Sequence, residues 1–279
     1  MYWCLMDTYD LQIKSAEGQL SVLQLTDPHL FAEESGTLLG VHTAQSFKAV
    51  LESILNQNLH FDCVIVSGDI SQDYSVSSYQ RFAHAVSVLE RPVFFVPGNH
   101  DDGPLMYRIL SDYGVNTQRC LIADKWQFVF LNSEVYSVPH GWVERHELNY
   151  LRDRIEERPD LNTVVVVHHL PRHVNSRWLD TQTMHNQDEF NSFICNFPQV
   201  KLVLSGHVHQ EYDQIFNNIR YIASPSTSIQ FEPYSHDFAL DLKGPGWRYL
   251  QFDWSGNINT QVFRLPEGRF IPDTSFTGY

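Results

Sequence analysis

The chain has 279 residues, of which 43% are hydrophobic and 19% charged, so its composition excludes a disordered protein and allows a full hydrophobic core. Its formal net charge of −14 argues against a protein that binds nucleic acid regardless of sequence, because an acidic surface repels a phosphate backbone. No segment approaches the ~20 consecutive apolar residues of a membrane helix, no basic leader opens the sequence and no two cysteines have CxxC spacing, so we expect a cytoplasmic protein without membrane contact.

The first part of the chain alternates predicted strands with predicted helices. Apolar runs at Leu20–Leu25, Cys63–Val66 and Val93–Val96 each end in a polar turn. Apolar side chains at three- and four-residue spacing, typical of a buried helical face, follow the first two runs, and Thr43 is a candidate N-cap. The two faces consist of Phe47, Val50, Leu51, Ile54 and Leu55, and of Tyr79, Phe82, Ala83, Val86 and Leu89. The alternation predicts parallel strands covered by helices.

The middle of the chain repeats this pattern less regularly. Strands are predicted at Trp126–Leu131, Thr163–Val167 and Lys201–Leu204, and helices at Glu144–Glu157 and Asp188–Phe197.

After residue 210 the pattern changes to strands joined by tight turns. Asn217-Asn218 indicates a hairpin between Asp213–Phe216 and Ile219–Ala223, and a second hairpin joins Trp247–Phe252 to Ile258–Phe263. We therefore expect the second half to supply a largely antiparallel sheet. The economical architecture is a pair of packed sheets with helices outside, in one domain over residues 16–265, with peripheral arms at residues 1–15 and 266–279.

Five polar clusters lie at predicted strand ends, where ligands bind in open α/β sheets. They are Asp27-x-His29, Gly68-Asp69, Gly98-Asn99-His100-Asp101, His168-His169 and Gly206-His207-x-His209. Each of the first four, taken alone, is more simply explained as a turn or a helix cap. Gly-His-x-His is more specific, because two His two residues apart on an extended segment point to the same side. Together these oxygen and imidazole donors favour divalent Mn, Fe, Co or Zn over calcium or a thiolate zinc site.

The five blocks, in this order, resemble the signature of the calcineurin-like metallophosphoesterase family. The resemblance implies an α/β four-layer sandwich, with two mixed sheets flanked by helices, and two metal ions (Fe, Mn, Zn or Co). It implies that one metal is held by Asp27, His29 and His209, the other by Asn99, His168 and His207, and that Asp69 bridges both. His169 remains an alternative to His168, because this chain has His-His-Leu-Pro where the family often has His-His-Pro.

The same resemblance implies the chemistry of a metal-dependent phosphoric diester hydrolase, in which a metal-bound hydroxide attacks the phosphate. His100 is the candidate general acid, and Asp101 lies nearby to orient it. The residues implied to contact the substrate are His29, Asp69, Asn99, His100, His168, His207 and His209. Because a carboxylate has two oxygens for two ions, changing Asp69 to Asn is expected to cost more activity than a comparable change at His169.

Segments outside the metal motifs resemble bacterial class III 3′,5′-cyclic-AMP phosphodiesterases. They are Leu25–Phe31, Leu38–Val41, Val138–Gly141, Pro225–Thr227 with Gln230-Phe231, and Pro245–Arg248, and the similarity runs from about residue 20 to Tyr279. This resemblance implies a small-molecule substrate, cyclic AMP, and its hydrolysis to 5′-AMP. Candidates to stack on the base are Phe31, Tyr136, His140 and Phe231.

Two alternative functions stay open. The same metals could act on 2′,3′-cyclic nucleotides, glycerophosphodiesters or nucleoside-diphosphate-linked substrates. A non-catalytic scaffold would keep the fold and lose the chemistry, but such a change usually erodes the ligand set, and none of the seven expected ligands is missing. The sequence also leaves a homodimer open.

Overall fold

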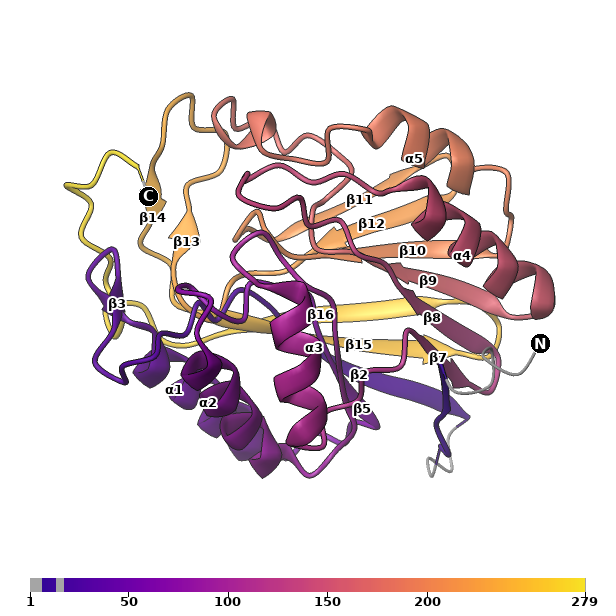
Figure 1. Cartoon of the computed structure of the whole chain (residues 1–279), viewed down its shortest axis with the longest axis horizontal. Coiled ribbons are helices and arrows are strands. Elements are labelled where there is room, and N and C mark those ends of the chain that lie inside the picture. Colours follow the sequence, from indigo (N-terminus) through magenta and orange to yellow (C-terminus); the bar gives the residue numbers. More distant parts are fainter. Residues whose placement is uncertain (1–6, 14–17, 279) are drawn as a thin grey trace.

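The computed structural model describes residues 7–13 and 18–278, and their elements form four layers (Figure 1). Two mixed sheets pack face to face, with α1, α2 and α3 outside the first sheet and α4 and α5 outside the second. This arrangement confirms the predicted α/β/β/α sandwich. The predicted N-terminal arm lies partly outside the described residues, as does Tyr279 of the C-terminal arm.

The first sheet has five strands in the order β16-β15-β2-β5-β6. Its parallel part is the predicted one: β2 (Gln19–Leu25), β5 (Cys63–Val66) and β6 (Val93–Phe95). The hairpin of β15 (Gly246–Asp253) and β16 (Ile258–Arg264) extends this sheet, because β15 pairs antiparallel with β2. We expected this hairpin to join one sheet with the other strands of the second half of the chain, and that expectation is wrong.

The second sheet has seven strands in the order β1-β7-β8-β9-β10-β12-β11, and it is largely parallel rather than antiparallel as predicted. Its strands are β1 (Thr8–Asp10), β7 (Cys120–Ala123), β8 (Trp126–Phe130), β9 (Asn162–Val166), β10 (Val200–Ser205), β11 (Tyr212–Phe216) and β12 (Ile219–Ala223). The Asn217-Asn218 turn correctly indicated the β11–β12 hairpin. A turn determines only its own hairpin, however, and β12 pairs parallel with β10 through contacts distant in sequence.

The helices are α1 (Thr43–Asn56), α2 (Val76–Val86), α3 (Gly103–Asp112), α4 (Arg145–Glu157) and α5 (Gln187–Ile194). Thr43 is the first helical residue and not the N-cap, which is His42. Leu55, predicted on the buried face of α1, is 46% exposed. Helix α3 was not predicted, although its start carries a clear local signal. Asp102 is the N-cap, and its side chain accepts a hydrogen bond from the Leu105 backbone N–H at 3.0 Å. Pro104 lies in the first turn, where a proline is well tolerated.

Short strands add two small hairpins, β3 (Thr37–Leu38) with β4 (Val41–His42) and β13 (Gln230–Phe231) with β14 (Leu240–Asp241). Neither was predicted, because two-residue strands carry no periodic signal.

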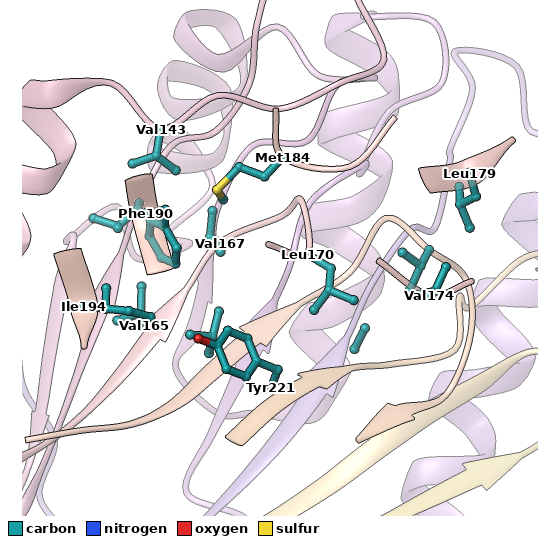
Figure 2. Packing of buried hydrophobic residues seen from close by; sticks show 14 of the residues in the cluster. Val143, Val165, Val167, Leu170, Val174, Leu179, Met184, Phe190, Ile194 and Tyr221 are labelled. Carbon is teal, nitrogen blue, oxygen red and sulfur yellow. The ribbon is translucent and has the colours of Figure 1, made fainter. Parts of the chain in front are cut away.

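Strand β9 shows why the central strands are continuously apolar. Its Val164 and Val166 point into the core between the sheets, whereas Val165 packs on the opposite face under the helices. Figure 2 shows that outer core, where Val165 lies near Phe190 and Ile194 of α5. With both faces buried, the polar groups that follow β9 and its neighbours can gather only at the strand ends.

Candidate metal centre

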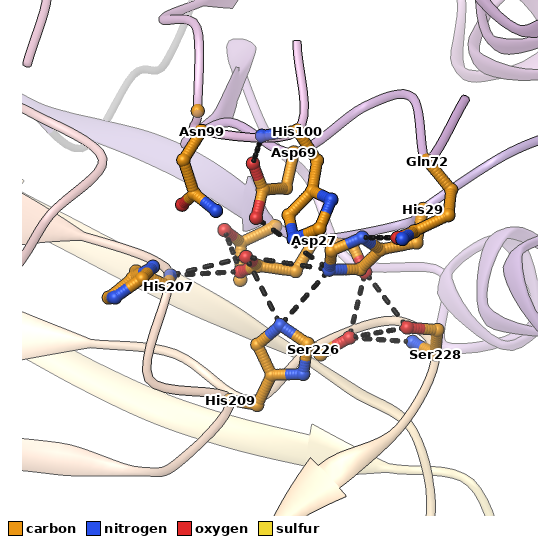
Figure 3. A network of polar contacts seen from close by, with 12 residues as sticks. Asp27, His29, Asp69, Gln72, Asn99, His100, His207, His209, Ser226 and Ser228 are labelled. Atoms are coloured by element: carbon orange, nitrogen blue, oxygen red, sulfur yellow. Dashed lines mark hydrogen bonds and ion pairs between the residues drawn. The ribbon is translucent and has the colours of Figure 1, made fainter. Parts of the chain in front are cut away.

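The five polar clusters converge at the carboxyl ends of β2, β5, β6, β9 and β10, so both sheets contribute to one site (Figure 3). All seven predicted ligands are buried, at 8% exposure or less: Asp27, His29, Asp69, Asn99, His168, His207 and His209. The His and Asp donor atoms of the site form overlapping groups of three within 4.8 Å of one another: Asp27 with His29 and His209, Asp27 with Asp69 and His168, His29 with Asp69 and His100, and His168 with His169 and His207.

On one side of the site, Asp27, His29 and His209 face one another. The Nε2 atoms of His29 and His209 are 3.1 Å apart, and His209 Nε2 lies 3.3 Å from Asp27 Oδ1. Two imidazole nitrogens and a carboxylate oxygen at these distances surround a space that suits one cation.

On the other side, Asp69, Asn99 and His168 meet. His168 Nε2 lies 3.3 Å from Asp69 Oδ2 and 3.2 Å from Asn99 Oδ1. The same Asp69 oxygen is 3.8 Å from His29 Nε2, so this carboxylate lies between the two groups. Asp69 therefore lies within reach of both groups of donors.

Hydrogen bonds to Nδ1 orient three of these imidazoles. His29 Nδ1 contacts Gln72 Oε1 at 2.6 Å, His168 Nδ1 contacts the Ser67 carbonyl at 2.6 Å, and His209 Nδ1 contacts the Ile229 carbonyl at 3.0 Å. Each acceptor holds the proton on Nδ1 and leaves the Nε2 lone pair directed into the site. This is the usual outer support of metal-bound His.

His207 and His169 differ in what their rings contact. Within the described residues, His207 Nε2 is buried and has no hydrogen-bond partner, which is costly unless a group absent from the polypeptide accepts its lone pair. Both ring nitrogens of His169 are engaged, Nδ1 by Ser133 Oγ at 2.8 Å and Nε2 by the Pro139 carbonyl at 3.2 Å. His168 directs its Nε2 to Asp69 and Asn99, but the donor atoms of His169 also lie within 4.8 Å of those of His168 and His207, so His169 remains an alternative ligand.

The buried carboxylates of Asp27 and Asp69 need positively charged partners. The ion pairs that the described residues offer to Asp27 and Asp69 come from His alone, and no Lys or Arg side chain takes part. Burial by itself raises the pKa of Asp27, but the adjoining His209 and His168 together outweigh it, and the net pKa lies below the ordinary value. Two ionised carboxylates inside a protein need positive partners, so the donor set fits metal ions.

The rings of His29 and His207 are suited to bind as neutral ligands. Burial lowers the pKa of His29 to about 3, against an opposing effect of Asp69, and burial likewise lowers the pKa of His207 to about 3. At neutral pH both rings are therefore unprotonated, the form in which imidazole binds metals.

Five of the predicted ligand residues adopt left-handed backbone angles, with φ between 48° and 68°: Asp27, His29, Asp69, His207 and His209. Such angles cost roughly 1–3 kcal/mol each in residues other than glycine, and they persist where the surrounding structure enforces them. Gly206 shows how tight those surroundings are: an added Cβ would lie 2.8 Å from both Asp27 Oδ2 and the Ser67 carbonyl.

The two predicted catalytic residues occupy different environments. His100 lies beside His29, with ring centroids 5.1 Å apart, and its backbone N–H donates to Asp69 Oδ1 at 2.8 Å. The Asp101 carboxylate accepts hydrogen bonds from the backbone N–H groups of Ile70, Ser71 and Gly98 at 2.9–3.2 Å. Asp101 thus ties together the loops that carry Asp69 and Asn99.

A cavity of about 400 Å³ opens onto the site, with Asn99, His100 and His207 in its wall. A larger hollow of about 660 Å³ lies along β11, but it contains none of the predicted ligands. The smaller cavity is within the size range of small-molecule sites.

Comparison with known proteins agrees with this geometry. The family model for calcineurin-like phosphoesterases matches residues 20–211. The chain belongs to this family. The 3′,5′-cyclic adenosine monophosphate phosphodiesterase CpdA of Vibrio vulnificus is 43% identical over 265 residues, 95% of this chain and 97% of that protein. The protein of the same name from Escherichia coli K12 is 40% identical over 266 residues, with the same coverage.

Among solved structures, a dimetal phosphatase from Danio rerio aligns with a TM-score of 0.59 and 12% identity, over 88% of this chain and 99% of that one. At this identity the likeness supports the phosphoesterase fold alone. In the described part of the chain, no helix has the length and apolar character needed to cross a membrane.

Several residues that support this phosphoesterase centre were not among the predicted ones. Gln72 orients His29, and the hydroxyls of Ser226 and Ser228 donate to the Asp27 carbonyl at 2.8 and 3.0 Å (Figure 3). Ser226 lies in one of the segments that resemble cyclic-AMP phosphodiesterases, so that resemblance already pointed to it. Gln72 had no such signal.

The metal-free phosphoesterase is expected to lose stability above neutral pH. Burial lowers the pKa of His168, but the adjacent Asp69 outweighs it and raises the pKa from 6.5 to about 9. Because the folded pKa exceeds the unfolded one, this stabilisation is complete below pH 6.5 and disappears as pH rises through 9. We expect the His168 contribution to the free energy of unfolding to fall by about 2 kcal/mol between pH 7 and 9.

Urea unfolding of chelated protein at pH 7, 8 and 9 measures this loss. His168→Gln should show a correspondingly shallower decline, and metal-loaded wild type should too, because a metal-bound ring stays neutral. Equal declines in chelated wild type and His168→Gln would contradict the assignment.

Proposed function

We propose that this phosphoesterase hydrolyses 3′,5′-cyclic AMP to 5′-AMP. The observation that carries the proposal is the pair of buried ligand groups sharing Asp69, in a chain that matches cyclic-AMP phosphodiesterases over 95% of its length. The cavity beside the centre, of about 400 Å³, is within the size range of small-molecule sites.

In this proposal Asp27, His29 and His209 would hold one ion and Asn99, His168 and His207 the other, and the Asp69 carboxylate, which lies between the two groups, would be shared by both. The oxygen and imidazole donors favour Mn, Fe, Co or Zn. When bound, such a pair of ions lowers the pKa of water towards about 7 and clamps the phosphate oxygens.

The remaining steps fall to residues of the chain. His100 borders the cavity next to Asn99, so its imidazole can deliver a proton to the ribose oxygen that leaves phosphorus. Asp101 holds the Asp69 and Asn99 loops in register through its three backbone hydrogen bonds. Tyr74 holds the loop that carries Asn99 at the edge of the cavity, because its hydroxyl donates to the Asn99 carbonyl at 3.3 Å.

Product analysis tests the proposal. Wild-type protein with Mn²⁺ should convert cyclic AMP to 5′-AMP, identified by chromatography, and Asn99→Ala should form little product. Equal turnover by both would mean that Asn99 is misassigned. Turnover of 2′,3′-cyclic AMP or a glycerophosphodiester with higher kcat/KM than cyclic AMP would replace the proposed substrate with the broader alternative.

A further inference from the structure

The wall of the cavity beside the metal centre includes the side-chain amide of Gln182. Gln182 is half-buried there, and its side chain makes no hydrogen bond to any residue that the structure describes. Its neighbours in the cavity wall are the apolar side chains of Val138, Pro139 and Leu179. Tyr74 and Ser137 also line this cavity. A few polar groups among apolar side chains are the usual means by which a small-molecule pocket fixes the orientation of its ligand.

The wall around Gln182 is held rigidly. Gln182 follows the 3₁₀ turn Leu179–Thr181, and its backbone N–H donates to the Leu179 carbonyl at 2.9 Å. The segment is also tied to the Val138–Pro139 loop: Gly141 N–H donates to the Thr183 carbonyl at 3.2 Å, and His185 N–H donates to the Gly141 carbonyl at 2.8 Å. The two sides of the wall therefore keep a fixed spacing.

A further bond joins this wall to the metal centre. His169 contacts the Pro139 carbonyl through Nε2, and its ring lies 4.6 Å, centroid to centroid, from that of His207. The distance between the wall and the phosphate position is thus set by packed side chains.

We propose that this cavity is the base subsite and that Gln182 recognises the edge of the adenine ring; this inference rests on the proposed cyclic-AMP activity. A glutamine amide has an acceptor oxygen beside a donor nitrogen. Adenine presents the complementary pair, its exocyclic amino group beside a ring nitrogen, and amide–adenine pairs of this kind are bidentate. The purine faces then rest against Val138, Pro139 and Leu179.

The aromatic residues that the sequence suggested for stacking on the base do not account for base recognition in this cavity. Of the four suggested by sequence, Phe231 alone borders the cavity, and it is 1% exposed. Its ring stacks on the His209 imidazole, with centroids 4.4 Å apart and planes 14° apart. Phe231 thus supports a metal ligand and closes the floor of the cavity. The other side-chain amide in the wall, Asn99, faces His168 at the centre.

Two substitutions at Gln182 separate base recognition from phosphate chemistry. In Gln182→Ala the bidentate pair is lost, so the ratio of kcat/KM for cyclic AMP to that for bis(p-nitrophenyl) phosphate, which has no base, should fall about 5-fold to 100-fold. In Gln182→Glu the donor is lost and only acceptors remain. A carboxylate suits guanine, whose ring N–H and amino group both donate, so the ratio of kcat/KM for cyclic AMP to cyclic GMP should fall by a similar factor. Gln214→Ala, on the exposed strand β11, is the matched control.

The outcomes distinguish the two proposals. If wild type forms 5′-AMP and both Gln182 variants keep the wild-type ratios, the base subsite is wrong and the proposed function stands. If wild type cleaves the aryl diester but not cyclic AMP, the proposed substrate fails and the adenine assignment fails with it. A fall in both ratios, with Gln214→Ala unchanged, supports the subsite.

Discussion

Replacing Asp69 by Asn is expected to lower kcat for cyclic AMP at least about 1,000-fold, because the loss removes several kcal/mol of charge stabilisation at the reacting phosphate. Asp69 Oδ2 lies 3.3 Å from His168 Nε2 and 3.8 Å from His29 Nε2, so a single carboxylate serves both ligand groups. An amide keeps the Oδ1 acceptor for the His100 N–H but presents a donor, not a lone pair, towards the centre. The fold should therefore survive while the bridge does not.

Metal content by elemental analysis, the melting temperature and kcat measured together test this expectation. His169→Asn is the informative comparison, because the His169 nitrogens contact Ser133 and Pro139, and we expect it to cost much less activity than Asp69→Asn. Asp213→Asn, at an ion pair with Arg220 on the surface, controls for the loss of one charge. An Asp69→Asn protein that kept two ions and a tenth of wild-type kcat would refute the bridging role.

Replacing His100 by Asn is expected to lower kcat/KM for cyclic AMP by about 100-fold to 10,000-fold, the range typical for loss of a general acid. The leaving group in cyclic AMP is a ribose alkoxide, which departs slowly without a proton. Bis(p-nitrophenyl) phosphate releases a stabilised phenolate instead, and its hydrolysis should fall far less.

The decisive measurement is the ratio of the loss of kcat/KM for cyclic AMP to the loss for bis(p-nitrophenyl) phosphate. His146→Asn, on an exposed ring of α4, should change neither rate. Equal losses on both substrates in His100→Asn would assign His100 to binding or metal positioning rather than to proton transfer.

The backbone of the centre helps explain why its geometry is stable. Five ligand residues hold left-handed angles that the sequence does not favour locally, and the hydrogen bonds of Asp101, Ser226 and Ser228 hold the loops that carry them. The free energy of packing the sheets beneath compensates for the strain of these angles, because β2, β5, β9 and β10 are almost wholly buried. The site is thus positioned by the core rather than by its own loops.

The sequence alone determined which side chains could form the centre. Parallel strands end at one edge of a sheet, so a polar cluster after each apolar run must lie near the others. Asp27 and Asp69 each follow such a run in the first sheet, and their convergence could therefore be predicted from the order of residues, whereas the inclusion of His207 came from the resemblance to the family signature. Helices α1 and α2 could also be predicted, because the apolar residues of a buried helical face recur every three or four residues along the sequence.

The tertiary structure alone decided how distant segments pair. It moved the β15–β16 hairpin onto the first sheet, made the second sheet largely parallel, and brought Gln182 and Phe231 to the cavity. It also gave His168 and His169 different partners, since His168 Nε2 lies beside Asp69 whereas His169 Nε2 contacts the Pro139 carbonyl. Periodicity and turns are properties of neighbouring residues, whereas strand order and cavity walls depend on which buried surfaces fit together across the whole chain.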